Sequence, residues 1–406
     1  MREVRISVQG LVLGMFVSRL DRPWLDSPFP LEGLSLDSEA DVTRLQRICS
    51  HVWVDTLRGV SPDVRYIEFE LPVSRSEEYE RLRKTEWQVT SEFRTELKQA
   101  EQVHASLEAG VAEVMQDLQE GRRLDVERLQ DGVEAMIDSI LRNPSAFTWL
   151  REMKYRDTYT YQHALGCAIW SASFGRHLGL DRSELRTLAL GGLLSDIGKS
   201  RLPPELLSKE PPLSPEEVEQ VRAHVRNGLE ILQDVPRLSP ETVEIVATHH
   251  ERHDGSGYPN GLKGAQIPMF GRIVGLVDSY DAMTAIRPYA ENRSPHAAVS
   301  ELYRHRGTLF QAELVEQFIQ HCGIYPIGTL VELTNGTVGV ITEVHSLKRL
   351  RPRVMLLLGP DKTPLAKFRE VNLIHVELDD DGAPLRIKRG LPSGAYGLDP
   401  VELFLA

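Results

Sequence analysis

The chain has few cysteines and no long hydrophobic run. Its three cysteines, Cys49, Cys167 and Cys322, are far apart and form no C-x-x-C pair. This spacing argues against a disulfide framework and against a thiolate zinc site, and it suits a reducing compartment. No stretch approaches the roughly 18 consecutive apolar residues of a membrane-spanning helix, and the N-terminus lacks the pattern of a signal peptide. We therefore expect a cytoplasmic protein with no membrane span.

An excess of positive charge is also missing. The 406 residues include 47 Lys and Arg against 59 Asp and Glu, a formal net charge of −12 at pH 7. A general nucleic-acid binder needs clustered Lys and Arg, so we expect no nucleic-acid partner. A small anionic substrate is still compatible with this composition, because a bound metal pair reverses the charge of one pocket. The length allows two or three domains.

The first third of the chain contains two contrasting patterns. Val4, Ile6 and Val8 alternate with polar residues as in a half-buried strand, and residues 1–70 predict a small α+β domain. Residues 71–140 are rich in charges at helical spacing, which is typical of exposed helices joined by weak ion pairs. They predict a charged helical connector. A dimerising coiled coil, and with it a homodimer, is left open.

The rest of the chain changes from helical to strand patterns. Residues 141–325 read as amphipathic helices with clear starts, such as the capping residues Ser214, Ser239 and Asp181. Residues 326–406 contain apolar runs joined by Asn335-Gly336, a strong hairpin signal, and they predict a β-rich C-terminal extension. The expected fold class is mainly α, with an all-helical domain between two smaller parts.

Six His and Asp side chains in the helical region could bind metal. An inward-facing histidine on its own is usually a hydrogen-bonded core residue, and an aspartate after an apolar run is often a helix cap. As a set, these nitrogen and oxygen ligands suit Zn, Mn or Fe. They predict a two-metal hydrolase in which a metal-activated water attacks phosphorus. The six are His163, Asp196, His224, His249, His250 and Asp278.

One segment of the helical region carries a highly specific motif. The run from His249 to Pro259, HHERHDGSGYP, combines a histidine pair with two glycines that permit close backbone approach. It resembles the HD-GYP family, a branch of the HD superfamily of metal-dependent phosphohydrolases. Asp196-Ile197-Gly198-Lys199 resembles most of the family's HD-x-GK element, and the likeness extends over about residues 157–289. The N-terminal residues, including Leu13 to Val17, resemble a domain of unknown function that often precedes HD-GYP domains.

The resemblance implies hydrolysis of cyclic di-GMP to the linear dinucleotide or to GMP. It implies two divalent ions, Fe or Mn, held by the six residues above, with Asp196 and Lys199 in catalytic roles. It also implies that the GYP loop shapes the pocket and offers a docking surface for diguanylate cyclases. The implied substrate-binding residues are Lys199, Arg287, Gly255, Gly257, Tyr258 and Pro259.

Two positions depart from the family pattern. Ser195 stands where the HD histidine is expected, and Ala290 stands where many relatives carry a lysine. In the implied arrangement the first metal keeps His163, Asp196 and Asp278, while the second keeps all four of its ligands. Three alternatives follow: a slowed phosphodiesterase with two ions or one, an inactive cyclic di-GMP receptor or signalling scaffold, and a hydrolase of another nucleotide.

Overall fold

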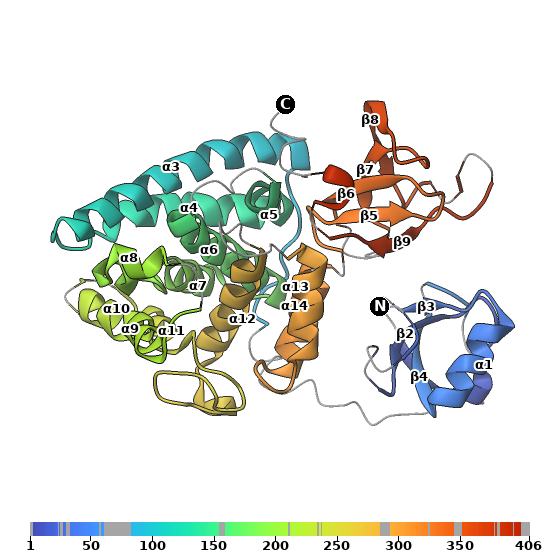
Figure 1. Ribbon diagram of the computed structural model, residues 1–406, viewed down its shortest axis with the longest axis horizontal. Coiled ribbons are helices and arrows are strands. Elements are labelled where there is room, and N and C mark those ends of the chain that lie inside the picture. The colour runs from blue at the N-terminus through green and yellow to red at the C-terminus, as the bar shows by residue number, and fades with distance from the viewer. Residues whose placement is uncertain are drawn as a thin grey trace. The chain divides into compact units, whose positions relative to one another are not determined.

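The structure is a computed structural model, and it divides into two compact units, residues 1–81 and 82–406 (Figure 1). Each unit is described by itself. The residues that the structure describes are 3–22, 24, 27–29, 33–56, 58–60, 83–153, 159–209, 212–233, 235–236, 238–284, 293–323, 325–344, 351–376, 378–379, 382–392 and 394–398.

In its described residues, the N-terminal unit contains a four-stranded antiparallel sheet and the helix α1. The strands lie in the order β1-β4-β2-β3. The helix begins after Ser38, whose hydroxyl accepts a hydrogen bond from the backbone N–H of Asp41, a standard N-cap. Apolar residues such as Ile6, Val17 and Val52 form the core. The elements are β1 (Glu3–Ser7), β2 (Phe16–Leu20), β3 (Leu34–Ser35), α1 (Glu39–Ile48) and β4 (His51–Asp55).

The second unit begins with three helices that pack together: α3 (Phe93–Gln119), α4 (Glu127–Arg142) and α5 (Pro144–Met153). The sequence predicts a charged connector here, but the structure differs, because α3 buries one side that includes Leu107 and Val111. Glu96 is also buried, and it accepts hydrogen bonds from Ser139 and Arg142 of α4. The charge of Glu96, which reads as solvated in the sequence, is therefore paired between helices.

Helix α3 also reaches the helix that carries the first candidate ligand. The side-chain amide of Gln162 donates to Glu108 of α3 over 2.6 Å, and Gln162 is the neighbour of His163 on α6. The remaining helices are α6 (Tyr159–Leu178), α7 (Arg182–Leu194), α8 (Pro204–Leu207), α9 (Pro215–Arg222), α10 (His224–Leu232), α11 (Pro240–Thr248), α12 (Met269–Thr284), α13 (Pro295–Arg304) and α14 (Ala312–Cys322), with the short 3₁₀ turns η4 (Ile197–Arg201) and η5 (Gly264–Gln266).

The caps predicted from the sequence are present. Asp181 and Ser214 each form a capping box with a glutamate three residues later, and Ser239 caps α11. The helix that approaches His224 breaks at Ala223, so that His224 is the first residue of a new helix rather than the middle of a longer one.

The C-terminal part is a five-stranded antiparallel sheet in the order β8-β7-β6-β5-β9. The predicted Asn335-Gly336 turn joins β5 to β6, and Gly336 has φ of +84°, a conformation that favours glycine. Trp149 of α5 packs against one of its two apolar clusters. The strands are β5 (Leu330–Leu333), β6 (Val338–Glu343), β7 (Arg353–Leu358), β8 (Pro364–Asn372) and β9 (Ile387–Gly390).

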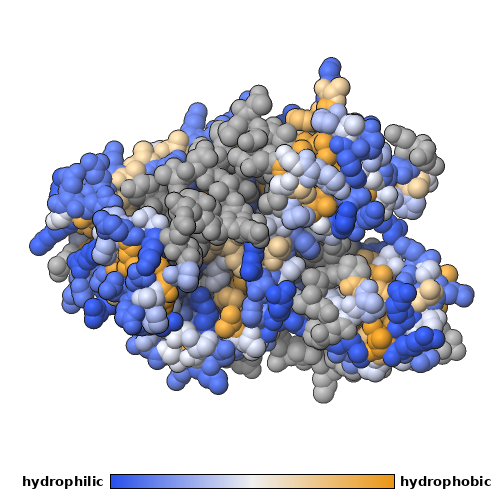
Figure 2. Space-filling view, viewed as in Figure 1, coloured by the Kyte–Doolittle hydropathy of each residue, from blue (hydrophilic) through white to orange (hydrophobic). Residues whose placement is uncertain are grey.

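The surface drawn in Figure 2 is mainly hydrophilic in its described part. On the face drawn in Figure 2, hydrophilic residues cover much of the surface, and hydrophobic residues show as separate patches. Within the described ranges, no helix is long and apolar enough to cross a membrane.

Removing the cap of α11 should destabilise the helical part. Ser239→Ala deletes the hydroxyl that accepts from the N–H of Thr242 over 3.1 Å, and we expect the free energy of unfolding to fall by about 1 kcal/mol. Urea denaturation followed by circular dichroism measures the change. Ser183→Ala, at an exposed position in the first turn of α7, is the matched control and should change stability little. Equal losses in both variants would contradict the capping role.

Candidate metal centre

All six predicted metal ligands lie in one region, although they come from five separate segments. His163 lies on α6 and Asp278 on α12. Asp196 lies between α7 and η4, and His224 begins α10. His249 and His250 directly follow α11. Five segments that are distant in sequence therefore contribute donor atoms to the same place.

Glycines allow these segments to approach closely. A Cβ atom at Gly198 would lie 2.0 Å from the carbonyl oxygen of His224, and one at Gly275 would lie 2.5 Å from that of His249. Both neighbours are backbone atoms, which cannot move aside as a side chain could. The two glycines therefore let η4 lie directly against α10, and α12 directly against the end of α11.

One group of donors has four members whose ligand atoms lie within 4.8 Å of one another: Asp196, His224, His249 and His250. The Nδ1 atoms of His224 and His249 lie 2.7 and 2.9 Å from the carbonyl oxygens of Val221 and Val246, to which they donate. Their Nε2 atoms, and Oδ1 of Asp196, are buried without a hydrogen-bond partner. Unpaired buried lone pairs are costly unless a cation binds them, so this donor set fits a divalent metal.

A second group shares the same carboxylate and has three members: His163, Asp196 and Asp278. Nε2 of His163 lies 3.0 Å from Oδ1 of Asp278 and 3.6 Å from Oδ2 of Asp196. Ser195 is buried, and its hydroxyl donates to the carbonyl oxygen of Gly192 over 2.9 Å. The hydroxyl proton of Ser195 is therefore taken up by a hydrogen bond at the end of α7.

Burial keeps the histidines of the four-membered group neutral. It lowers the pKa of His249 to about 4, and together with the charge of His249 it lowers the pKa of His250 to about 2. Burial likewise lowers the pKa of His224. A neutral imidazole is the form that binds metal, so these three side chains are ready to act as ligands near neutral pH.

The carboxylates of the site are ionised. Burial opposes this, but the charge of Lys199, whose Nζ contacts Oδ2 of Asp196, keeps the pKa of Asp196 below its ordinary value. Burial also opposes ionisation of Asp278, and the hydrogen bond from His163 keeps the pKa of Asp278 well below its ordinary value. For His163 burial alone would lower the pKa, but the neighbouring Cys167 and the hydrogen bonds to Asp278 and Asp281 raise it well above 6.5.

Two functional residues were missed by sequence reasoning at the first site. Asp281 accepts a hydrogen bond from Nδ1 of His163 over 2.8 Å, and Arg151 donates two bonds to the same carboxylate. The only sequence signal was the position of Asp281, three residues after Asp278 on the same helix. Nothing in the sequence pointed to Arg151, which lies 130 residues away from Asp281.

Glu251 holds the glycine-rich loop, and its role was also missed. Its carboxylate is buried and accepts from the backbone N–H groups of Asn260 and Leu262 over 2.8 and 2.9 Å. A Cβ atom at Gly257 would lie 2.4 Å from the backbone nitrogen of Arg252. Gly257 is therefore required by the close fold of the loop back onto its own beginning.

The predicted loop residues lie beside the metal ligands. The ring of Tyr258 stacks on His250, with centroids 4.6 Å apart and an interplanar angle of 26°. Gly255 has φ of +85°, which favours glycine, and Pro259 is exposed after a cis peptide bond. Arg287, and the departure at Ala290, lie outside the described residues.

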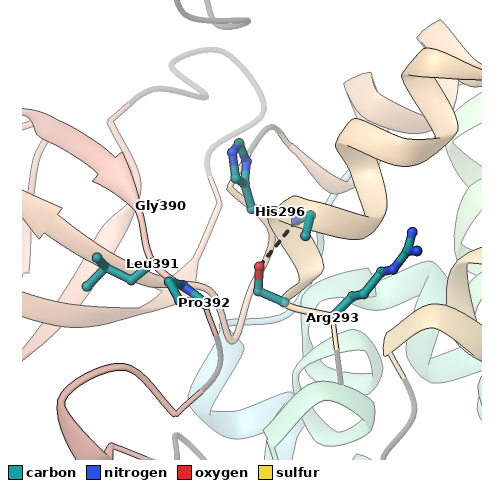
Figure 3. Close-up of a pocket in the computed structure, with 7 residues that line it drawn as sticks. Arg293, His296, Gly390, Leu391 and Pro392 are labelled. Atoms are coloured by element: carbon teal, nitrogen blue, oxygen red, sulfur yellow. Dashed lines mark hydrogen bonds between the residues drawn. The ribbon is translucent and has the colours of Figure 1, made fainter. Parts of the chain in front are cut away.

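A separate cavity of about 480 Å³ lies between α13 and the end of β9 (Figure 3). None of the predicted ligands lines it, so the metal centre is not this cavity. Its lining residues are Arg293, Ser294, His296, Ala297, Gly390, Leu391 and Pro392.

Two family models match the chain. The HD domain model covers residues 141–314, which contain every described candidate ligand. A model described as a domain of unknown function, DUF3391, covers residues 3–129. A cyclic di-GMP phosphodiesterase of Pseudomonas aeruginosa is 34% identical over 367 residues, which make up 89% of this chain and 87% of the relative. The chain belongs to the HD-GYP family. The predicted resemblance and the mainly α fold class are confirmed, and the protein is a metal-dependent hydrolase of phosphodiester bonds.

Other HD-GYP relatives match over shorter lengths. A 3'3'-cGAMP-specific phosphodiesterase of Vibrio cholerae is 31% identical over 195 residues, 47% of this chain and 37% of the relative. Among solved structures, an HDG"Y"P protein from Bdellovibrio bacteriovorus gives a TM-score of 0.47 with 17% identity, covering 78% of this chain and 98% of that chain.

Acidification should destabilise the metal-free protein. Between pH 6.5 and 4 the unfolded chain binds protons at positions 249 and 250 that the folded chain does not, because both histidines have lowered pKa values. The free energy of unfolding therefore falls as the pH falls through this window. Melting temperatures of chelator-treated protein from pH 6.5 to 5 measure the trend, because the folded chain protonates His163, whose pKa is raised, above this window. His250→Gln should reduce the slope, and a melting temperature that rises on acidification would contradict the assignment.

Proposed function

We propose that this HD-GYP protein hydrolyses cyclic di-GMP. The observation that carries the proposal is Asp196, a carboxylate shared by two groups of candidate metal ligands, whose Oδ1 atom is buried without a hydrogen-bond partner beside unpaired histidine Nε2 atoms. The choice of substrate is supported by the relative from Pseudomonas aeruginosa, which is named a cyclic di-GMP phosphodiesterase and aligns with nearly the whole chain.

Each of the site residues has a role in this proposal. His163 and Asp278 complete one ion site, and His224, His249 and His250 complete the other, with Asp196 common to both. Bound ions of this kind supply a hydroxide nucleophile near neutral pH and stabilise charge on phosphate oxygens. Lys199 lies against Asp196, where its positive charge can also meet a substrate phosphate.

The loop and Arg287 complete the proposed substrate site. Tyr258 offers an aromatic ring beside the ligands, since it stacks on His250, and Gly255 and Gly257 let the loop turn tightly. Arg287 is proposed to contact a phosphate or a guanine. Pro259 and Asn260 are exposed, and they offer a surface to a protein partner such as a diguanylate cyclase.

The two ion sites are proposed to differ in affinity. The second site keeps four protein ligands, whereas the first has three, because the Ser195 hydroxyl donates to Gly192. Loss of an outer-sphere partner alone costs about 10–100-fold in metal affinity, so the loss of a direct ligand weighs at least as much. We therefore expect one tightly bound Fe or Mn ion and one weak ion in each chain.

A receptor without turnover is the second candidate function, and Ser195 is the observation that favours it. If the weak ion is not bound under working conditions, the protein still presents one ion, Lys199 and the loop to the nucleotide. Such a protein would bind cyclic di-GMP and release it unchanged.

The side chain at position 195 should control activity. With saturating Mn, the native protein should hydrolyse cyclic di-GMP, and Ser195→His should bind the weak ion of the first site at least about tenfold more tightly. Asp196→Asn should abolish turnover, because it removes the carboxylate common to both sites. The measurements are product formation by chromatography and metal content by mass spectrometry on the same samples.

Ser195→Ala is the matched control for these variants. It removes the bond to Gly192 without adding a ligand, so it should leave the affinity for the weak ion near the native value. Turnover that appears only in Ser195→His would establish the receptor. No turnover in either protein, with both ions bound, would overturn the phosphodiesterase on cyclic di-GMP.

Substrate choice can be tested on the same preparations. Because the relative that aligns with nearly the whole chain is named for cyclic di-GMP, we expect kcat/KM for cyclic di-GMP to exceed that for 3'3'-cGAMP by at least about tenfold, a difference of about 1.4 kcal/mol in transition-state binding. Competition between the two nucleotides in one reaction measures the ratio directly. A preference for the mixed nucleotide would assign the enzyme to the other group of relatives.

A further inference from the structure

We propose that Asp281 and Arg151 are positioning residues that aim His163 at the first metal site. The inference rests on the proposed function, because it concerns the weaker of the two proposed ion sites. Neither residue belongs to the ligand set predicted from the sequence, and both act through His163 rather than on the substrate.

The contacts form a continuous chain from α5 to the metal centre. Nε and Nη2 of Arg151 each donate to one carboxylate oxygen of Asp281 over 2.8 Å. Oδ2 of Asp281 lies 2.8 Å from Nδ1 of His163, and Nε2 of the same ring lies 3.0 Å from Oδ1 of Asp278. One imidazole therefore connects the buried ion pair on one side with the metal ligands on the other.

The pair is fully enclosed. The side chains of Arg151 and Asp281 are 4% and 0% exposed. A Cβ atom at Gly166 would lie 2.1 Å from Oδ1 of Asp281 and 2.3 Å from Nε of Arg151. The glycine on α6, three residues after His163, thus leaves the space that the two charged groups occupy. An arginine and a carboxylate joined by two hydrogen bonds in such a space have one orientation. This fixes the carboxylate of Asp281, which accepts from His163.

The orientation matters because a histidine binds metal through one ring nitrogen only. Asp281 accepts the Nδ1 proton, so Nε2, which donates to Asp278 in this structure, is the nitrogen aimed at Asp278 and Asp196 and the one that would bind an ion in place of its proton. A carboxylate partner also makes the ring a more basic ligand. With Ser195 in place of a histidine, the first site has three protein ligands, and its affinity depends more strongly on how His163 is held.

The second site uses a different device, which gives the proposal an internal control. His224 and His249 donate their Nδ1 protons to the backbone carbonyl groups of Val221 and Val246. No side-chain substitution at Asp281 or Arg151 removes these bonds. A change in the buried pair should therefore weaken one ion and spare the other.

The test is Asp281→Asn in the full chain, titrated with Mn. We expect the weak ion to bind about 10–100-fold more weakly, while the affinity of the tight ion stays at its native value. Nitrogen-15 NMR of histidine-labelled, Zn-loaded protein should show a changed signal for the Nδ1–H group of His163. The Nδ1–H signals of His224 and His249 should stay unchanged. Ser279→Ala, on the same helix with its hydroxyl bonded to the carbonyl of Gly275, is the matched control and should change neither measurement.

Arg151→Lys keeps the experiment decisive if Asp281→Asn does not fold. Lysine keeps the charge but offers a point contact instead of two parallel bonds, so the weak ion should lose affinity in the same direction by a smaller factor. Unchanged Nδ1 signals and unchanged weak-ion affinity in the folded variants would overturn the positioning role, and so would equal weakening of both ions. These readouts do not use the nucleotide, so failure to hydrolyse cyclic di-GMP would overturn the proposed function and leave this inference standing.

Discussion

The metal centre depends on one largely enclosed carboxylate, Asp196, whose charge is compensated by the groups around it. Lys199 contacts one of its oxygens, while His163 and His224 approach from two different helices. An isolated ionised carboxylate would be expensive in such a place. Around this residue the helices meet through backbone contacts that only glycine permits, at Gly198 and Gly275. Charge compensation and close packing thus act on the same few atoms, and the positions of the remaining ligands follow from them.

The centre is supported in two ways. At the four-membered group the rings of His224 and His249 are fixed by carbonyl groups at the ends of helices, so the helix geometry itself orients them. At the three-membered group the orientation comes from side chains, through Asp281 and Arg151. Backbone support is insensitive to substitution, whereas side-chain support can vary between relatives. The departure at Ser195 falls on the group with side-chain support.

Local chemistry explains what could be predicted from the sequence. The caps at Asp181, Ser214 and Ser239 and the Asn335-Gly336 turn depend on residues a few positions apart, and the structure contains them all. The six candidate ligands, which the sequence pattern grouped into one site, also lie together in the structure. Tertiary effects explain the rest. The buried face of α3, the pairing of Arg151 with Asp281 and the direction of the Ser195 hydroxyl depend on partners that no local pattern contains.

The bond between Glu108 and Gln162 shows that family boundaries and packing boundaries differ in this chain. The match to the domain of unknown function ends at residue 129, yet α3 within it packs on helices of the HD domain and contacts the neighbour of His163. A fragment that began at residue 141, where the HD match begins, would cut α4 in its last turn and expose apolar surface on α5 and α6 to water. We therefore expect the smallest fragment that keeps the metal centre intact to include α3. The segments matched by the two family models have to be expressed and altered together.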